Sequence, residues 1–341
     1  MLRSPETRYA LERYLQHETG ATKVAIHAAT ALTAGAVQEN WKIEAEMTGG
    51  SLAGRHLLVL RTDAPTRIAA SLGRAEEYAV LCAARGAGVT VPEPLFCCSG
   101  TAALGRPFFI MQWAEGETSG AKLVRDECGA EQRGEIALSL ARELATIHGI
   151  RPPRLDLAAL GDPPADPAAE RVALYRRWLD DFEDPHPVAE WALRWLAREK
   201  SAASEIVLLH GDFRTGNYLV GKKAPTAILD WEFANWGDPH EDIGWFCCKS
   251  WRFGAIDREA GGLAPRALFY RAYEEHARRT LDTKRLHYWE VMASLRWLLL
   301  ALQQRERYLR GGERSLALAL TGRRPAECEF EILRLIEAGT L

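Results

Sequence analysis

Several features that mark particular classes of protein are missing from this sequence. The longest wholly apolar run, residues 297–302, is far too short to cross a bilayer. Residues 1–20 carry charged and aromatic side chains and resemble a helix rather than a secretory signal peptide. We therefore expect a cytoplasmic protein with no membrane partner.

Long runs of one charge and metal-binding cysteine spacings are also missing. A net charge of −3 over 341 residues gives no electrostatic attraction to nucleic acid, so a small-molecule partner is the more natural expectation. The seven cysteines show no C-x-x-C spacing and no neighbouring His-rich tract. This pattern predicts buried, reduced thiols rather than disulfides or a zinc site. The oligomeric state stays open.

The length and the order of the predicted elements indicate two lobes. A chain of 341 residues exceeds the size at which a single core usually gives way to two. Alternating apolar residues predict strands in residues 22–63 and in two short stretches around 89–115, with a helix between them over 70–88. We place this small lobe, an antiparallel sheet with one helix, at residues 1–115, and a larger, mainly helical lobe at 116–341. The predicted fold class is α+β.

The stretch "IVLLHGDFRTGNYLV", residues 206–220, carries the main chemical signal. Short apolar runs bounded by turn residues predict two buried strands with a polar loop between them. Asp212 and Asn217 lie on this loop, and Asp230 ends the next strand, "TAILDW". Phosphoryl transfer needs a base that orients the attacking hydroxyl and Mg²⁺ that neutralises phosphate charge. We expect the three side chains to converge on one site that supplies both.

These motifs resemble those of protein kinases. "HGDFRTGN" is similar to the kinase catalytic loop H-R-D-x-x-x-x-N, with glycine in place of arginine, and "ILDWE" stands where the D-F-G motif would be. H-G-D together with "DWE…GDPxxD" resembles the aminoglycoside phosphotransferase family, which has a bilobal protein-kinase-like fold. The full pattern looks closest to the branch found with acyl-CoA dehydrogenases. The resemblance covers roughly residues 30–250 and is strongest over 206–244.

The resemblance implies roles for residues of the larger lobe. Asp212 would be the catalytic base, with Asn217 and Asp230 as Mg²⁺ ligands. His210 would anchor the loop, and Asp238 and Asp242 would brace it by hydrogen bonds. Glu232 would either support Asp230 or contact the metal, two alternatives that the sequence leaves open.

It also implies a nucleotide site in the small lobe. Arg61 stands where kinases carry a lysine for the α- and β-phosphates, with Glu77 as its expected partner and Glu76 as a competing choice. The turn around Gly35 would cover the phosphates, although it lacks the G-x-G-x-x-G pattern. Backbone groups near Gln112 and Ala114 would hydrogen-bond the adenine edge.

The predicted function is an ATP- and Mg²⁺-dependent phosphotransferase acting on a hydroxyl of a small molecule, with GTP as an alternative donor. The family places the substrate between the catalytic loop and the helices at 168–200 and 284–310, where Asp180, Asp181 and Arg296 are candidate contacts. Because the charges there are mixed, an anionic or acyl substrate fits at least as well as a polyamine, and an antibiotic-resistance role is not supported.

Two other classes of protein compete with the kinase interpretation. A catalytically silent, kinase-like nucleotide-binding module is favoured by Arg61 and the glycine-poor turn, but the intact set of base and metal residues argues against it. A binuclear metallohydrolase would need clustered imidazoles. His148, His240 and His287 are not spaced as such a cluster.

Overall fold

The computed structural model describes the whole chain except residues 33–37, 64–70, 126–128, 201, 202, 204, 340 and 341. The chain divides into two compact units. Unit 1 comprises Met1–Gly116, Arg154–Gly161 and Thr226–Ala234, and unit 2 comprises Glu117–Pro153, Asp162–Pro225 and Asn235–Leu341. Two short segments of unit 1 thus come from the range that the sequence analysis gave to the larger lobe. One of them carries Asp230.

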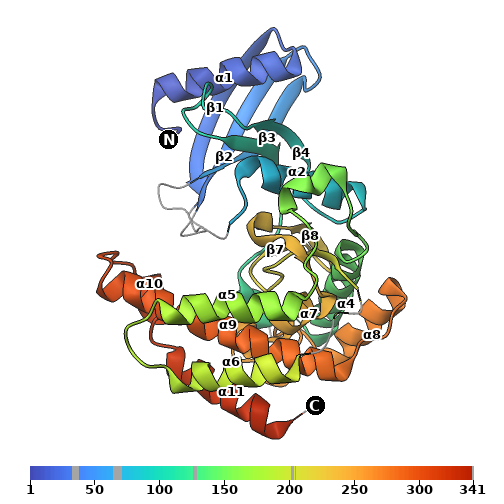
Figure 1. The fold of residues 1–341 in the computed structure, drawn as a ribbon. Coiled ribbons are helices and arrows are strands. Elements are labelled where there is room, and N and C mark those ends of the chain that lie inside the picture. The colour runs from blue at the N-terminus through green and yellow to red at the C-terminus, as the bar shows by residue number, and fades with distance from the viewer. Residues whose placement is uncertain (33–37, 64–70, 126–128, 201–202, 204, 340–341) are drawn as a thin grey trace. The chain divides into compact units, whose positions relative to one another are not determined.

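Unit 1 is built on a five-stranded antiparallel sheet with the strand order β1-β2-β3-β5-β4 (Figure 1). The strands are β1 (Lys23–Leu32), β2 (Gln38–Thr48), β3 (Gly54–Asp63), β4 (Pro94–Cys98) and β5 (Phe108–Gln112). In this register Trp41 of β2 faces Leu60 of β3, and Arg61 faces Phe109 of β5. Because side chains alternate between the faces of a sheet, Leu60 and Arg61 point to opposite sides.

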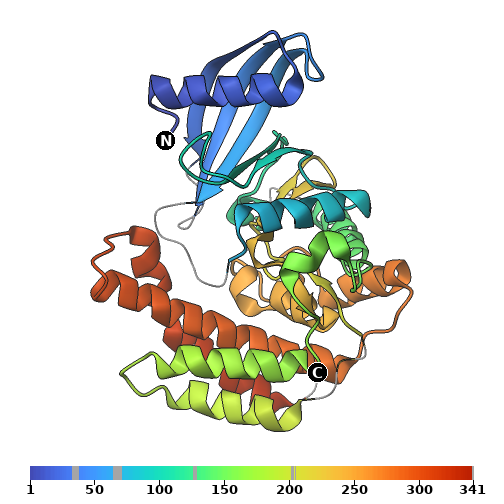
Figure 2. The same ribbon diagram turned by 45° about the horizontal axis from the view of Figure 1, so that its top comes forward.

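Helix α1 (Pro5–Thr19) covers one face of this sheet, as Figure 2 also shows. The Ser4 hydroxyl caps the helix by accepting a hydrogen bond from the Thr7 N–H, and Gly20 ends it in the left-handed conformation. Leu11 and Leu15 of α1 are fully buried in one core with Trp41 and Leu60. The alternating apolar residues that predicted the strands are the ones that form this core.

Helix α2 (Arg74–Gly86) and the 226–234 segment complete the part of unit 1 that matters for function. The segment contains most of β8 (Pro225–Ile228) and the short helix η2 (Trp231–Phe233), while η1 (Leu155–Leu160) comes from the other insertion. Backbone hydrogen bonds fix the segment within the unit, from the Ile228 N–H to the Thr90 carbonyl and from the Leu72 N–H to the Glu232 carbonyl, both at 2.8 Å.

Unit 2 is mainly helical. Its longer helices are α4 (Ala130–Ile147), α5 (Pro167–Asp180), α6 (Pro187–Glu199), α7 (Pro239–Cys247), α8 (Arg266–Ala277), α9 (Thr283–Leu309) and α11 (Pro325–Ala338), and its shorter ones are α3 (Gly120–Val124), η3 (Lys249–Trp251) and α10 (Leu316–Thr321). Helices α5, α6, α9 and α11 lie side by side in both views and share one apolar core (Figures 1 and 2). This arrangement confirms the predicted α+β class.

Three short strands of unit 2 frame the predicted loop. Strand β6 (Val207–Leu209) pairs antiparallel with β9 (Asn235–Gly237), and β7 (Tyr218–Val220) follows the loop. Helix α7 starts directly after β9 and crosses α9 closely at Gly244, where an added Cβ would lie 2.7 Å from the backbone of Trp289. Only glycine permits this approach, which brings α7 and α9 to the loop.

Two findings bear on the excluded classes of protein. In the described ranges, no helix combines the length and the apolar character that a bilayer crossing needs. The six described cysteines are free thiols, and three of them, Cys247, Cys248 and Cys328, are buried.

Candidate catalytic site

The turn that leads into the predicted catalytic loop is held by Asp242 on α7. Its carboxylate accepts hydrogen bonds from the backbone N–H groups of His210, at 2.7 Å, and Gly211, at 3.0 Å. Gly211 has φ of 76°, a left-handed conformation that glycine adopts without the usual steric cost. The predicted bracing role of Asp242 therefore has a definite geometry: one buried carboxylate fixes two consecutive peptide groups.

His148 supports Asp242 from behind. Its Nε2 lies 3.3 Å from the Asp242 carboxylate and its Nδ1 lies 2.7 Å from the Tyr273 hydroxyl. Burial alone would raise the pKa of Asp242, but the hydrogen bond and charge of His148 and the neighbouring His210 lower it below its ordinary value. Asp242 therefore stays ionised. From its place near the end of a helix, His148 was expected to be a packed or dipole-satisfying residue; it is fully buried at the end of α4, and its contact with Asp242 was not predicted.

Asp212 is held by three side-chain donors. The Trp245 indole N–H donates to its Oδ1 at 2.7 Å, and its Oδ2 accepts from Asn217 Nδ2 at 2.6 Å and from Arg214 Nε at 3.2 Å. The carboxylate side chain keeps 14% of its surface exposed. Its orientation is thus set before any ligand binds, as a general base requires. The contacts of Trp245 and Arg214 with Asp212 were not predicted from the sequence.

Asn217 closes the loop onto its own start. Besides the bond to the Asp212 carboxylate, its amide nitrogen donates to the Asp212 carbonyl at 2.9 Å. Because the nitrogen of a carboxamide is the donor, the Oδ1 atom of this buried residue is left as the acceptor. An amide oxygen of this kind suits Mg²⁺, which prefers hard oxygen ligands.

His210 and Asp238 take different positions in this arrangement. The ring of His210 is buried, and its Nδ1 accepts from the Asp212 N–H at 3.2 Å, as expected of a loop anchor. Asp238 does not brace the loop as expected: its side chain instead caps α7 and binds His240 Nδ1 at 2.7 Å, Trp289 Nε1 at 3.1 Å and the guanidinium of Arg285. It anchors α7 to α9, because Arg285 and Trp289 both belong to α9.

The three residues predicted to contact the substrate lie in two separate regions of unit 2. Arg296 lies beside the loop, where its Nη1 donates to the Gly211 carbonyl at 2.7 Å and its guanidinium lies 4.2 Å from the Trp245 ring centroid. Asp180 and Asp181 are at the carboxyl end of α5, and Asp180 lies 3.6 Å from Arg176 on the same helix. Only Arg296 contacts the residues around Asp212.

In unit 1 the predicted cation is paired twice. Arg61 forms ion pairs with Glu77 of α2 at 2.9 Å and with Asp230 at 2.8 Å. Burial alone would lower the pKa of the Arg61 guanidinium, but the charges of Glu77, Asp230 and Glu232 more than offset this effect and raise it. Glu77, and not Glu76, is therefore the partner of Arg61.

Glu77 has a second partner that the sequence analysis did not consider. Arg74, one turn earlier on α2, is also paired with Glu77, and its Nε lies 2.9 Å from the Asp63 carboxylate at the end of β3. Arg61 and Arg74 are both buried. Two buried guanidinium groups therefore share one carboxylate, and each has a second carboxylate partner of its own.

Asp230 has an unusual backbone. Its φ and ψ are both 62°, a left-handed conformation that few residues other than glycine adopt and that is enriched at functional sites. Its side chain is 39% exposed, so an ion or a ligand can reach it. A carboxylate is a suitable Mg²⁺ ligand, and the donor chemistry of Asp230 and Asn217 fits this metal. Glu232 lies two residues on, within the electrostatic reach of Arg61.

The expected adenine-binding segment and phosphate turn are only partly described. The Gln112 N–H donates to the Glu93 carbonyl at 2.9 Å, so this group is already occupied, and Ala114 is the better candidate for a ligand. The adjacent Trp113 ring lies 4.4 Å from the Lys42 ammonium. Gly35 lies outside the described residues.

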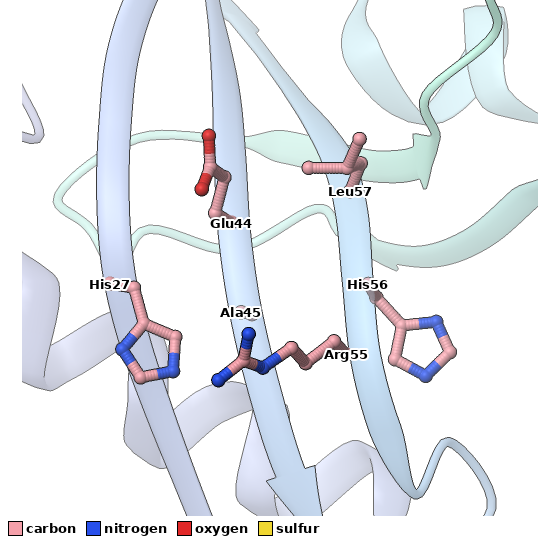
Figure 3. A pocket seen from close by; sticks show the side chains of 6 residues that line it. All are labelled: His27, Glu44, Ala45, Arg55, His56 and Leu57. Atoms are coloured by element: carbon pink, nitrogen blue, oxygen red, sulfur yellow. The ribbon is translucent and has the colours of Figure 1, made fainter.

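A further cavity of unit 1 was not predicted. It is lined by His27, Glu44, Ala45, Arg55, His56 and Leu57 (Figure 3). The Arg55 guanidinium extends across β2 toward His27, while the His56 ring projects to the other side. The Glu46 carboxylate contacts both His27 and Arg55: its Oε2 lies 2.9 Å from His27 Nε2 and 3.5 Å from Arg55 Nε. These groups are largely exposed, which is typical of a solvated sheet face.

Comparison with known proteins identifies the class. The model of the phosphotransferase enzyme family matches residues 29–281. The chain therefore belongs to this family, which confirms the resemblance seen in its motifs.

Curated relatives match part of the chain. The mouse acyl-CoA dehydrogenase family member 10 is 27% identical over 203 residues, which are 58% of this chain and 18% of the relative. The chicken acyl-CoA dehydrogenase family member 11 is 30% identical over 180 residues, or 50% of this chain and 22% of the relative. The chain thus spans about a fifth of the length of these relatives.

Solved structures match almost the whole chain in fold. A putative aminoglycoside phosphotransferase from Ralstonia eutropha superposes with a TM-score of 0.78 over 98% of this chain and 99% of that one, at 18% identity. A thermostable mutant of aminoglycoside phosphotransferase APH(4)-Ia, in a ternary complex with ADP and hygromycin B, superposes with a TM-score of 0.59. The match covers 97% of this chain and 99% of that one, at 17% identity. At such identities the likeness shows the kinase-like fold.

Proposed function

We propose that this protein transfers the γ-phosphate of ATP, or alternatively GTP, to a hydroxyl group of a small molecule in a Mg²⁺-dependent reaction. The observation that carries the proposal is the fixed Asp212 carboxylate, which is oriented by Trp245, Asn217 and Arg214 on a turn that Asp242 holds. Family membership supports it, and so do relatives of the same fold that were solved with ADP.

The residues of the chain divide the work as follows. Asp212 accepts the proton of the attacking hydroxyl, and its three donors keep it in the orientation for that transfer. Asn217 through Oδ1 and Asp230 through its carboxylate would hold Mg²⁺, which when bound neutralises charge on the phosphates. Arg61 would supply a cation to the nucleotide, held in place by Glu77. That Asp212, Asn217 and Asp230 converge on one ion stays a prediction.

The test compares the parent with Asp212→Ala and the exposed control Asp257→Ala. We expect Asp212→Ala to lose turnover of Mg·ATP with a panel of hydroxylated acceptors while nucleotide binding, followed by the rise in melting temperature with Mg·ATP, is retained. Asp257→Ala should match the parent. Equal turnover in all three proteins would refute the role of Asp212, and no thermal shift with Mg·ATP would refute the nucleotide dependence.

One observation favours a second candidate, a catalytically silent module that binds a nucleotide and regulates a partner. Asp230 is already paired with Arg61 at 2.8 Å, so a metal ion would have to compete with a guanidinium for this carboxylate. The acyl-CoA dehydrogenase relatives are compatible with such a role. A Mg·ATP-induced thermal shift combined with no turnover in either the parent or Asp212→Ala would favour the silent module.

A further inference from the structure

The peptide group between Gly211 and Asp212 is held on both of its sides. Its carbonyl accepts a hydrogen bond from Arg296 Nη1 at 2.7 Å, and its N–H donates to His210 Nδ1 at 3.2 Å. Because a peptide group is planar, the orientation of this one sets the direction in which the Asp212 side chain leaves the backbone. Glycine restricts its own backbone less than any other residue, so this orientation depends on the hydrogen-bond partners of the peptide.

The guanidinium of Arg296 also supports the side chain of Asp212, through Trp245. It lies 4.2 Å from the centroid of the Trp245 ring, a cation–π contact, and the N–H of the same ring donates to Asp212 Oδ1 at 2.7 Å. Arg296 is therefore connected to Asp212 by two routes, one through the backbone and one through the indole.

The packing of α7 against α9 places Arg296 at this point. The two helices approach closely where Gly244 meets the backbone of Trp289. Arg296 follows Trp289 by seven residues, which is about two turns of α9, so both residues lie on the side of α9 that faces α7. Trp245 of α7 and Ala293 of α9 belong to one small buried apolar cluster. The position of the guanidinium is thus set by helix packing and not by a loop.

The sequence predicted Arg296 as a substrate contact, but its contacts are with the protein. Its Nη1 is occupied by the Gly211 carbonyl and its guanidinium lies against the Trp245 ring. It also lies within the electrostatic reach of a buried carboxyl: burial raises the pKa of Glu241, and the charges of Arg171 and Arg296 act against this rise. A partly buried cation with these partners supports the site from within the protein.

We propose that Arg296 is a positioning residue, which fixes Asp212 in the orientation for proton transfer by holding the Gly211 carbonyl and the Trp245 ring at the same time. It does not touch the reacting atoms. This inference rests on the proposed function and deepens it, because it replaces the expected substrate contact with a role in orienting the base. Loss of Arg296 should therefore slow the chemical step and leave ligand affinity nearly unchanged.

Backbone amide exchange tests the positioning without an activity assay. Hydrogen–deuterium exchange of the full chain is followed by mass spectrometry in the parent, in Arg296→Gln and in the matched control Arg305→Gln, which replaces an exposed arginine of the same helix. Because Arg296→Gln removes a hydrogen bond from a charged donor, we expect about tenfold faster exchange in the fragment that contains residues 210–213, with α11 unchanged. Arg305→Gln should match the parent.

Two outcomes of the exchange experiment would overturn the proposal. Unchanged exchange of residues 210–213 in Arg296→Gln would show that the loop does not depend on this guanidinium. A uniform increase over the whole chain would show that Arg296 contributes only to global stability.

Kinetics separate positioning from substrate binding. The probe is the basal hydrolysis of Mg·ATP, in which water takes the place of the acceptor alcohol. We expect Arg296→Gln to lower kcat about tenfold while the KM for ATP stays within about twofold of the parent value. Arg296→Lys keeps a charged donor for the Gly211 carbonyl and should remain within about threefold of the parent kcat. Arg305→Gln should hydrolyse Mg·ATP as the parent does.

A substrate-binding role for Arg296 predicts a different result. No acceptor alcohol is present in this assay, so a residue that only binds the acceptor would leave the hydrolysis unchanged. Unchanged hydrolysis in Arg296→Gln, a raised KM with an unchanged kcat, or an Arg296→Lys variant as slow as Arg296→Gln would each overturn the positioning role.

The two experiments also separate this inference from the proposed function. Faster exchange confined to residues 210–213 in Arg296→Gln, with no turnover of Mg·ATP by the parent in water or with the panel of hydroxylated acceptors, would retain the support of the loop by Arg296 and refute the phosphotransferase function. Turnover that depends on Asp212 but is equal in the parent and Arg296→Gln would do the reverse.

Discussion

The two polar centres of this molecule are stabilised in different ways. In unit 2 the Asp212 loop is fixed mostly by neutral donors, namely peptide N–H groups on Asp242 and an indole N–H and a carboxamide on Asp212. In unit 1 the centre consists mainly of ion pairs: Arg61 and Arg74 share Glu77, and Arg61 also holds Asp230.

This difference has a consequence for ligand binding. Two of the three donors to Asp212 are neutral and the third is the Arg214 guanidinium at 3.2 Å, so most of the contacts that orient this carboxylate do not neutralise its charge before a ligand arrives. A guanidinium that already has two carboxylates must give up part of one pair to bind a phosphate, so ligand binding in unit 1 includes the cost of that exchange. Four substitutions test this comparison.

The largest effect is expected at Asp242. Asp242→Ala leaves two buried backbone N–H groups without an acceptor and removes one of the two partners of His148, which should lower the free energy of unfolding by about 3–5 kcal/mol. Urea denaturation measures the change. Asp257→Ala, at an exposed position, should stay within about 0.5 kcal/mol of the parent. A loss below about 1 kcal/mol for Asp242→Ala would show that the loop does not depend on this carboxylate.

Glu77 tests the charged centre in the same way. Glu77→Gln removes the shared carboxylate of two buried arginines and should lower the free energy of unfolding by about 3 kcal/mol. The neighbouring Glu76→Gln is the matched control, because Glu76 has no ion pair in the described part of the chain, and its effect should be small. If the two substitutions have equal effects in urea denaturation, the charge pairing in unit 1 contributes little.

Asp238 is stabilised in both ways, by a charged and by a neutral donor. Its partners in unit 2 include the guanidinium of Arg285 and the indole N–H of Trp289. Burial alone would raise its pKa, but His240 and Arg285 lower it to about 2. A lowered pKa means that its contribution is present above the unfolded value near 3.8 and is lost as the pH falls toward 2. The difference between the unfolded and folded pKa values of Asp238 corresponds to about 2 kcal/mol in the free energy of unfolding. The free energy of unfolding, measured from pH 4 to pH 2, should therefore fall more steeply in the parent than in Asp238→Asn. Parallel curves for the two proteins would contradict the lowered pKa of Asp238.

In both centres the sequence predicted the motif residues better than the side chains that contact them. Asp212, Asn217 and Asp242 stand in motifs of fixed spacing, and Arg61 lies two residues before the end of a strand that its apolar residues predict. Their partners do not follow from spacing: Trp245 reaches Asp212 from 33 positions away and His148 reaches Asp242 from 94. Such contacts depend on how α7 and α4 pack, which local patterns do not encode.

The choice between Glu76 and Glu77 shows the same limit at short range. Adjacent residues on a helix differ by about 100° in direction, so only the position of α2 against the sheet decides which of them meets Arg61. The fold itself was more predictable, because the sheet and the α9 core both follow from the periodicity of apolar residues. The division into units was harder to foresee, since the Asp230 segment joins unit 1 by backbone hydrogen bonds that leave no mark in composition.

The smallest expected effect tests the neutral donors at the reacting group. Trp245→Phe keeps an aromatic ring beside Trp251 and Arg296 but removes the N–H that donates to Asp212 Oδ1 at 2.7 Å. One charge-assisted hydrogen bond is worth about 1.5 kcal/mol, so kcat should fall about tenfold while the KM for the nucleotide changes little. Trp191→Phe, at a partly exposed position on α6, is the control. If Trp245→Phe raises KM and leaves kcat unchanged, the indole serves ligand binding rather than the orientation of the base, and the contrast between the two centres is weaker than the contacts indicate.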